Sequence, residues 1–184
     1  MTPDGTLPHH HESAAFVPAS AERVFALIDD HARLSSHMTK RSWMMGGGRM
    51  AVEIDDGGGR VVGSRVQLAG RIFGVRLALE EVVTERDPPA RKVWETTAPP
   101  RLLVIGHYRM GFEITPERDG ARLRVFIDYA LPDTVPARWL GHLLGRFYAK
   151  WCTGRMVRDA ATQLDSRGLQ IDASQPQRVP DDRD

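Results

Sequence analysis

The sequence predicts an α+β fold in which one antiparallel sheet packs against one long helix. About ninety residues before position 136 alternate between apolar and polar side chains, as strands do, with short turns between them. Residues 136–167 then carry apolar side chains at helical spacing, and such a stripe must be buried against the sheet. If the sheet curves around this helix, we expect the space between them to form a ligand cavity.

Composition restricts the class of protein. The chain has 184 residues and a mass of 20.6 kDa, with 41% apolar and 27% charged residues, which is ordinary for one globular domain. A net charge of +1 and a pI near 8.0 do not give the basic surface of a nucleic-acid-binding protein, so no nucleic-acid partner is expected. Cys152 is the one cysteine, which excludes an intrachain disulfide and favours a cytoplasmic location.

The two ends differ in composition from the rest. Residues 1–10 and 169–184 are polar and contain proline, so we expect both to be disordered, with one domain over residues 11–168. Neither a signal-peptide core near the start nor an apolar run of about 18 residues is present. The sequence therefore predicts no integral contact with a membrane.

The predicted elements follow in order. A first strand over residues 11–19 ends before Ser20, which is a suitable N-cap for a short helix to Ile28. A second short helix is expected at residues 31–38, and the two helices would form a movable cavity mouth. Glycine and proline turns then separate six strands, and connections this short favour antiparallel neighbours. These strands are expected at residues 43–54, 60–69, 74–85, 91–98, 102–115 and 121–131.

Alternation along the strands predicts which side chains point inward. In residues 102–115 the even positions, including Tyr108 and Met110, form the apolar face, and in residues 121–131 the odd positions do, including Tyr129. In residues 74–85 the carboxylate of Glu81 interrupts an otherwise apolar face. The long helix is predicted to bury Leu140, Leu143, Leu144, Phe147, Trp151, Val157, Ala161 and Leu164. Gly154 shares the face of Trp151, where it would either leave room for a ligand or, more simply, allow close packing on the sheet.

Several motifs together resemble a known family. These are residues 17–30 (VPASAERVFALIDD), Trp43, Gly63-Ser64, residues 85–89 (ERDPP) followed by Trp94, and the closing amphipathic helix. In order and spacing they resemble the START-like superfamily, known in bacteria as the SRPBCC or polyketide cyclase/dehydratase family. The resemblance covers residues 11–167 and implies a helix-grip fold, in which a seven-stranded antiparallel sheet wraps around the C-terminal helix and encloses an apolar cavity.

The resemblance implies binding or transport of a hydrophobic small molecule such as a lipid, quinone or polyketide. Some members close or dehydrate aromatic rings, but the family shares no universal catalytic residue, so none is assigned. We expect the cavity to be lined by Glu81, Trp94, Tyr108, Met110, Tyr129, Phe147, Trp151 and Gly154.

The polar residues leave alternatives open. A buried Glu81 could act as a general acid or base, whereas at the sheet rim it would be solvated or paired with an arginine such as Arg76. One alternative function is therefore a cyclase or dehydratase that uses Glu81 or Tyr129 for proton transfer, and another is a protein-binding adaptor. His9–His11 lacks further ligands at metal-binding spacing, and the glycine triplets match no nucleotide-binding motif. No metal or cofactor is expected, and the oligomeric state stays open.

Overall fold

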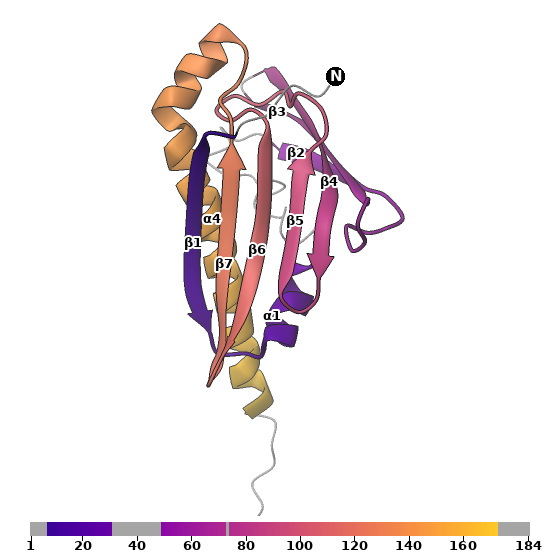
Figure 1. Cartoon of the computed structure of the whole chain (residues 1–184), viewed down its shortest axis with the longest axis vertical. Coiled ribbons are helices and arrows are strands. Elements are labelled where there is room, and N and C mark those ends of the chain that lie inside the picture. Colours follow the sequence, from indigo (N-terminus) through magenta and orange to yellow (C-terminus); the bar gives the residue numbers. More distant parts are fainter. Residues whose placement is uncertain (1–6, 31–48, 73, 173–184) are drawn as a thin grey trace, which may run out of the picture.

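The computed structural model describes residues 7–30, 49–72 and 74–172. Within these residues, seven strands form one antiparallel sheet in the order β1-β7-β6-β5-β4-β3-β2 (Figure 1). The strands are β1 (His9–Val17), β2 (Arg49–Ile54), β3 (Arg65–Ile72), β4 (Val75–Asp87), β5 (Arg91–Thr96), β6 (Tyr108–Glu117) and β7 (Gly120–Tyr129), and the helices are α1 (Ala21–Ile28) and α4 (Val135–Asp172). The predicted α+β fold, a sheet closed by a long C-terminal helix in the helix-grip arrangement, is confirmed.

Both helices lie on the concave face of the sheet. The long helix α4 runs beside β1 and β7, and its first turns extend past the ends of these strands (Figure 1). Ser20 caps α1 as predicted, because its hydroxyl accepts a hydrogen bond from the Arg23 amide at 3.5 Å. Phe25 of α1 then packs edge-on against Phe112 of β6, with ring centroids 5.5 Å apart. This contact fixes α1 over the centre of the sheet.

The predicted inward faces of three strands are confirmed. The even residues of β6, the odd residues of β7 and the segment from Leu77 to Val83 on β4 are buried in alternation. Phe126 is buried on the opposite face, where its ring lies beneath the guanidinium groups of Arg91 and Arg124. The core therefore lies between the sheet and the two helices.

Several predicted boundaries differ from the structure. Strand β1 begins at His9, inside the segment expected to be disordered, and α4 continues to Asp172. Strand β3 begins only at Arg65, because the residues before it form a turn in which Ser64 bonds both Asp55 and the Gly59 amide. Residues 102–107 are not a strand, and β6 begins at Tyr108. The predicted helix at residues 31–38 and Trp43 lie outside the described residues.

The predicted apolar stripe of α4 is wrong in its first half. Leu143, Leu144 and Phe147 are exposed, whereas smaller residues are buried: Gly141, Gly145, Ala149, Cys152 and Ala160. A β-carbon on Gly141 would lie 2.9 Å from the backbone oxygen of Val104, closer than such contacts normally come. The helix approaches the loop at Val104 so closely here that only small residues fit. Its large apolar residues are consequently turned outward.

Candidate functional site

A hydrogen-bonded carboxylate and phenol are buried on the concave face of the sheet. Glu81 of β4 is 3% exposed and Tyr108 of β6 is 5% exposed, and the Tyr108 hydroxyl donates a hydrogen bond to the Glu81 carboxylate. Glu81 therefore does not sit at the sheet rim with Arg76, which is exposed. A buried carboxylate is costly unless it is hydrogen-bonded, so the two residues depend on each other.

Helix α4 brings two more titratable groups to this pair. Burial raises the pKa of the Tyr108 hydroxyl well above its usual value, and the charge of Glu81 adds to this effect. Burial also raises the pKa of the Tyr148 hydroxyl, and it raises that of the Cys152 thiol to about 12, again with a contribution from Glu81. Both phenols keep their protons at neutral pH and can act as donors, whereas Cys152 lacks the thiolate that a nucleophile needs.

Apolar side chains surround the polar pair. Trp94 of β5 is 3% exposed and lies opposite Met110 of β6 in the ladder, which is 5% exposed. Trp151 of α4 is half-buried, and its ring lies 5.9 Å from that of Tyr148. The structure therefore places Glu81, Trp94, Tyr108 and Met110 on one buried surface, with Trp151 at its edge.

The structure treats the three other predicted cavity residues differently. Tyr129 is buried opposite Tyr108 in the ladder, but its ring stacks 5.1 Å from that of His9 at the edge of the sheet. Phe147 is 57% exposed, which contradicts its expected place inside. A β-carbon on Gly154 would meet the Ser13 hydroxyl of β1 at 3.7 Å, an ordinary contact distance, so close packing does not require glycine here and both interpretations of Gly154 stay predictions.

Sequence reasoning missed Tyr148 as part of this site. The signal was present in the series Gly141, Gly145 and Ala149, small residues four positions apart that mark the face of α4 in closest contact with the sheet. Tyr148 and Cys152 lie beside that face on the helical wheel. Large apolar residues on the other side gave a stronger but misleading pattern.

A second buried polar cluster, also missed, fixes α1 to the sheet. Lys92 of β5 is 0% exposed, and its ammonium donates to the Asp29 backbone oxygen at 2.7 Å and to the Asp29 carboxylate at 3.0 Å. Arg86 donates twice to the same carboxylate, at 3.2 and 2.9 Å. Burial favours a higher pKa for Asp29, but the hydrogen bonds from Arg86 and Lys92 outweigh it and lower the pKa. Period-two alternation from Trp94 would have placed Lys92 inside.

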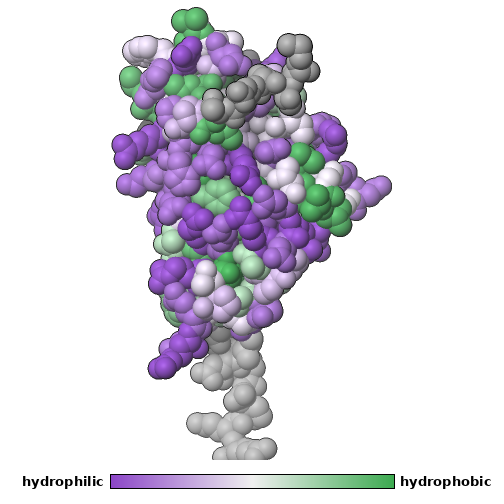
Figure 2. Space-filling model, viewed as in Figure 1, coloured by the Kyte–Doolittle hydropathy of each residue, from purple (hydrophilic) through white to green (hydrophobic). Residues whose placement is uncertain are grey.

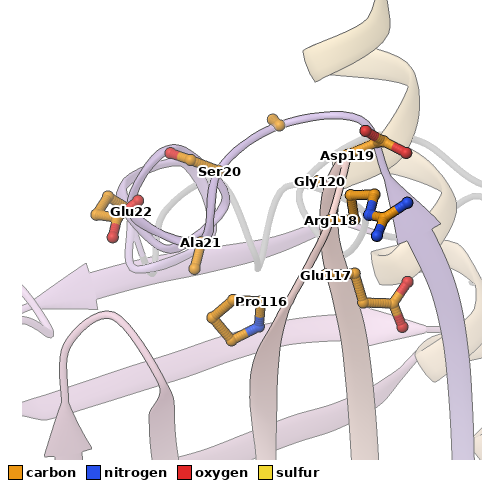
Figure 3. Close-up of a pocket in the computed structure, with 9 residues that line it drawn as sticks. Ser20, Ala21, Glu22, Pro116, Glu117, Arg118, Asp119 and Gly120 are labelled. Atoms are coloured by element: carbon orange, nitrogen blue, oxygen red, sulfur yellow. The ribbon is translucent and has the colours of Figure 1, made fainter.

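A surface hollow of about 290 Å³ lies between the start of α1 and the β6–β7 turn. Figure 3 shows Ser20, Ala21 and Glu22 on one side of it and residues 116–120 on the other. Its charged residues are Glu22, Glu117, Arg118 and Asp119, which does not match the apolar cavity expected beneath α4. That cavity stays a prediction.

Among the described residues, no three histidine, cysteine, aspartate or glutamate side chains come close enough together to hold a metal ion. No helix in the described part of the chain combines the length and the apolarity needed to cross a bilayer.

The fold has many solved counterparts at low identity. The Zhui aromatase/cyclase from Streptomyces sp. R1128 is 14% identical, with 87% of this chain and 95% of that chain covered and a TM-score of 0.61. TTHA0849 from Thermus thermophilus is 20% identical, with 91% and 100% covered and a TM-score of 0.57. Protein CV1439 from Chromobacterium violaceum is 18% identical, with 85% and 98% covered and a TM-score of 0.56. At these identities the likeness shows the fold alone.

The family of the chain follows from its sequence. No curated protein matches it. Residues 8–167 do match the family described as polyketide cyclase / dehydrase and lipid transport, which is of the SRPBCC type. This match covers most of the chain and agrees with the helix-grip arrangement of β1–β7 and α4. The protein therefore belongs to the polyketide cyclase / dehydrase and lipid transport family.

Proposed function

We propose that the protein binds a hydrophobic small molecule, such as a lipid, quinone or polyketide, without a covalent bond, between the sheet and α4. The observation that carries this proposal is the buried pair of Glu81 and Tyr108 within an apolar surface. A few polar groups in an apolar wall are how sites for small molecules fix the orientation of a ligand. The family description, which includes lipid transport, supports the same class of ligand.

The binding energy would come from removing apolar surface from water, at about 25 cal/mol per Å² before ordering costs. Trp94, Met110 and Trp151 supply the apolar contacts. The Tyr108 hydroxyl, which keeps its proton, would share its hydrogen bond between Glu81 and a ligand oxygen. We also propose a reducing compartment such as the cytoplasm as the location, because Cys152 is the one cysteine of the sequence and no intrachain disulfide can form.

The test begins with the purified full-length protein. Native mass spectrometry, followed by solvent extraction, identifies any compound that remains bound. Titrations with a fluorescent fatty acid, a short-chain quinone and an anthraquinone then compare Glu81→Gln and Tyr108→Phe with Glu53→Gln, an exposed carboxylate on β2. We expect at least one ligand to bind, and its affinity to fall about tenfold in the first two variants and to be unchanged in the third. Absence of binding by all three ligands, with no retained compound, contradicts the proposal.

A second candidate function is proton transfer during ring closure or dehydration of a polyketide. The same pair supports it, because a carboxylate that accepts from a phenol in a dry site can relay a proton. The Zhui aromatase/cyclase, whose fold is similar, gives a reason to test it. An enzyme would lose turnover in Glu81→Gln while still binding substrate, whereas a carrier shows no turnover in the parent protein.

A further inference from the structure

The first half of α4 exposes a line of large apolar side chains, which we call the outer stripe. It consists of Val135, Trp139, Leu143, Leu144 and Phe147, which are 81%, 67%, 63%, 41% and 57% exposed. Four of them are spaced four residues apart and so lie along one side of the helix. Figure 2 shows hydrophobic residues gathered at the upper end of α4, with hydrophilic residues beside them. Contiguous exposed apolar surface of this kind marks an interaction site.

The charges of this helix segment all have one sign. Between Asp133 and Asp159 the sequence contains no acidic residue, but it contains Arg138, Arg146, Lys150, Arg155 and Arg158. Arg146 and Lys150 lie on the β1 side of the stripe, close to His11. Burial lowers the pKa of His11, and the positive charges of Lys150 and Arg146 lower it further because they are near. The outer stripe is thus bordered by positive charge, and its partner should be negative.

We propose that the outer stripe and its basic border bind the surface of an anionic lipid bilayer. A helix with exposed tryptophan, leucine and phenylalanine on one side and arginine or lysine beside them has the composition of interfacial membrane-binding helices. The stripe is a convex line on a helix that projects past the ends of β1 and β7, so it can reach a flat surface without a groove (Figure 1). Tryptophan in particular favours the depth of the lipid head groups.

A second copy of the chain fits this surface less well. A symmetric dimer through the outer stripe would place the same residues of both copies against each other. Arg146 and Lys150 of one copy would then face cations of the other, with no acidic residue in this segment to offset them. An anionic bilayer neutralises the same charges. The inference does not depend on the proposed small-molecule function, since it requires no cavity.

The experiment measures sedimentation of the full-length protein with lipid vesicles. Vesicles of phosphatidylcholine with about 30% phosphatidylglycerol are compared with pure phosphatidylcholine, at low salt and at about 0.5 M salt. We expect binding to the anionic vesicles, with affinity reduced at least tenfold by either neutral lipid or high salt. Equal binding to both kinds of vesicle, or binding to neither, overturns the proposal.

Paired variants locate the contact. Trp139→Ser with Phe147→Ser should weaken binding at least about tenfold, whereas Val61→Ser with Val62→Ser, which are equally exposed but lie in the turn before β3, should not. Arg146→Gln with Lys150→Gln should weaken it about thirtyfold, since each basic residue near such a surface contributes about fivefold. Arg76→Gln with Arg118→Gln is the matched control of exposed cations on other elements.

A spectroscopic measurement separates insertion from other causes. In the parent protein, lipids brominated on the acyl chain should quench part of the tryptophan fluorescence. Trp139→Phe should keep vesicle binding but lose that quenching. A dimer seen by analytical ultracentrifugation that persists with vesicles and dissociates in Trp139→Ser/Phe147→Ser would overturn the proposal in favour of self-association. Circular dichroism confirms that each variant is folded.

Discussion

Replacing Asp29 by asparagine should be among the most destabilising conservative changes in this protein. Asp29 is the anion that offsets both Lys92, which is 0% exposed, and Arg86. Asparagine keeps the shape but leaves the two cations close together in a buried place. Removing one partner from a buried ion pair costs about 3–5 kcal/mol, and we expect a loss in this range.

The matched variant Lys92→Met removes a cation from the same cluster. Asp29 would then keep its two hydrogen bonds from Arg86, so the carboxylate stays paired. The Asp29 carbonyl and carboxylate would each give up one bond from Lys92, but no charge would be left unpaired, so the loss should be about 1–2 kcal/mol. Urea unfolding of both variants, with slopes checked against the parent protein, measures the difference. A loss in Lys92→Met equal to or greater than that in Asp29→Asn would refute this reasoning.

The pH dependence of the Asp29→Asn variant gives a second check. Burial lowers the pKa of Lys92, although Asp29 raises it in part. Without Asp29 this pKa falls further, so over the interval between the folded and the ordinary value the unfolded chain binds more protons. Stability then increases with pH. The deficit of Asp29→Asn should therefore shrink as the pH rises toward the ordinary lysine pKa of about 10.4.

Three further predictions concern other parts of the structure. Tyr108→Phe removes the donor to buried Glu81 and should lower the free energy of unfolding by about 2 kcal/mol in urea. A hydrogen bond to Asp128 raises the pKa of His10, so the stability that His10 adds is present at low pH and is lost as the pH rises through its folded-state pKa. The loss of stability in His10→Gln should be only about 0.5 kcal/mol near pH 5.5, because the pair is partly exposed. This loss should vanish by about pH 8. Gly141→Ala should lower the thermal midpoint, because its β-carbon would meet a backbone oxygen at 2.9 Å, whereas Gly154→Ala, with 3.7 Å to a side chain, should raise it through helix propensity. A rise in Gly141→Ala would show that α4 and the loop at Val104 can move apart at little cost.

The sequence predicted the sheet and its inward face well, because side chains alternate along a strand and only one of its two faces is apolar enough to be buried. If Tyr108 is on the buried face, Met110 and Phe112 must share that face. Glu81 stands out because its carboxylate interrupts the apolar face of β4. Capping of α1 by Ser20 was equally local. Each of these depends on residues within a few positions of one another.

The rotation of α4 could not be predicted in the same way. Both sides of its first half are apolar, one with large residues such as Leu143 and Phe147 and one with small residues such as Gly141 and Gly145. Hydrophobicity alone favours burying the large side. The close approach of α4 to the loop at Val104 decides otherwise, and this loop lies far from Gly141 and Gly145 in the sequence. The outer stripe is the direct consequence of this choice.

The two buried polar clusters of the concave face differ in what they could release to a ligand. In the cluster of Asp29, the carboxylate accepts hydrogen bonds from two cations. Replacing either of these hydrogen bonds by one to a ligand would leave a buried charge without its opposite charge. In the cluster of Glu81, the donor is the neutral hydroxyl of Tyr108, which can share its hydrogen bond between Glu81 and a ligand oxygen without separating two opposite charges. The first arrangement suits an anchor for α1, and the second suits a site that must open and close its hydrogen bond each time a ligand enters.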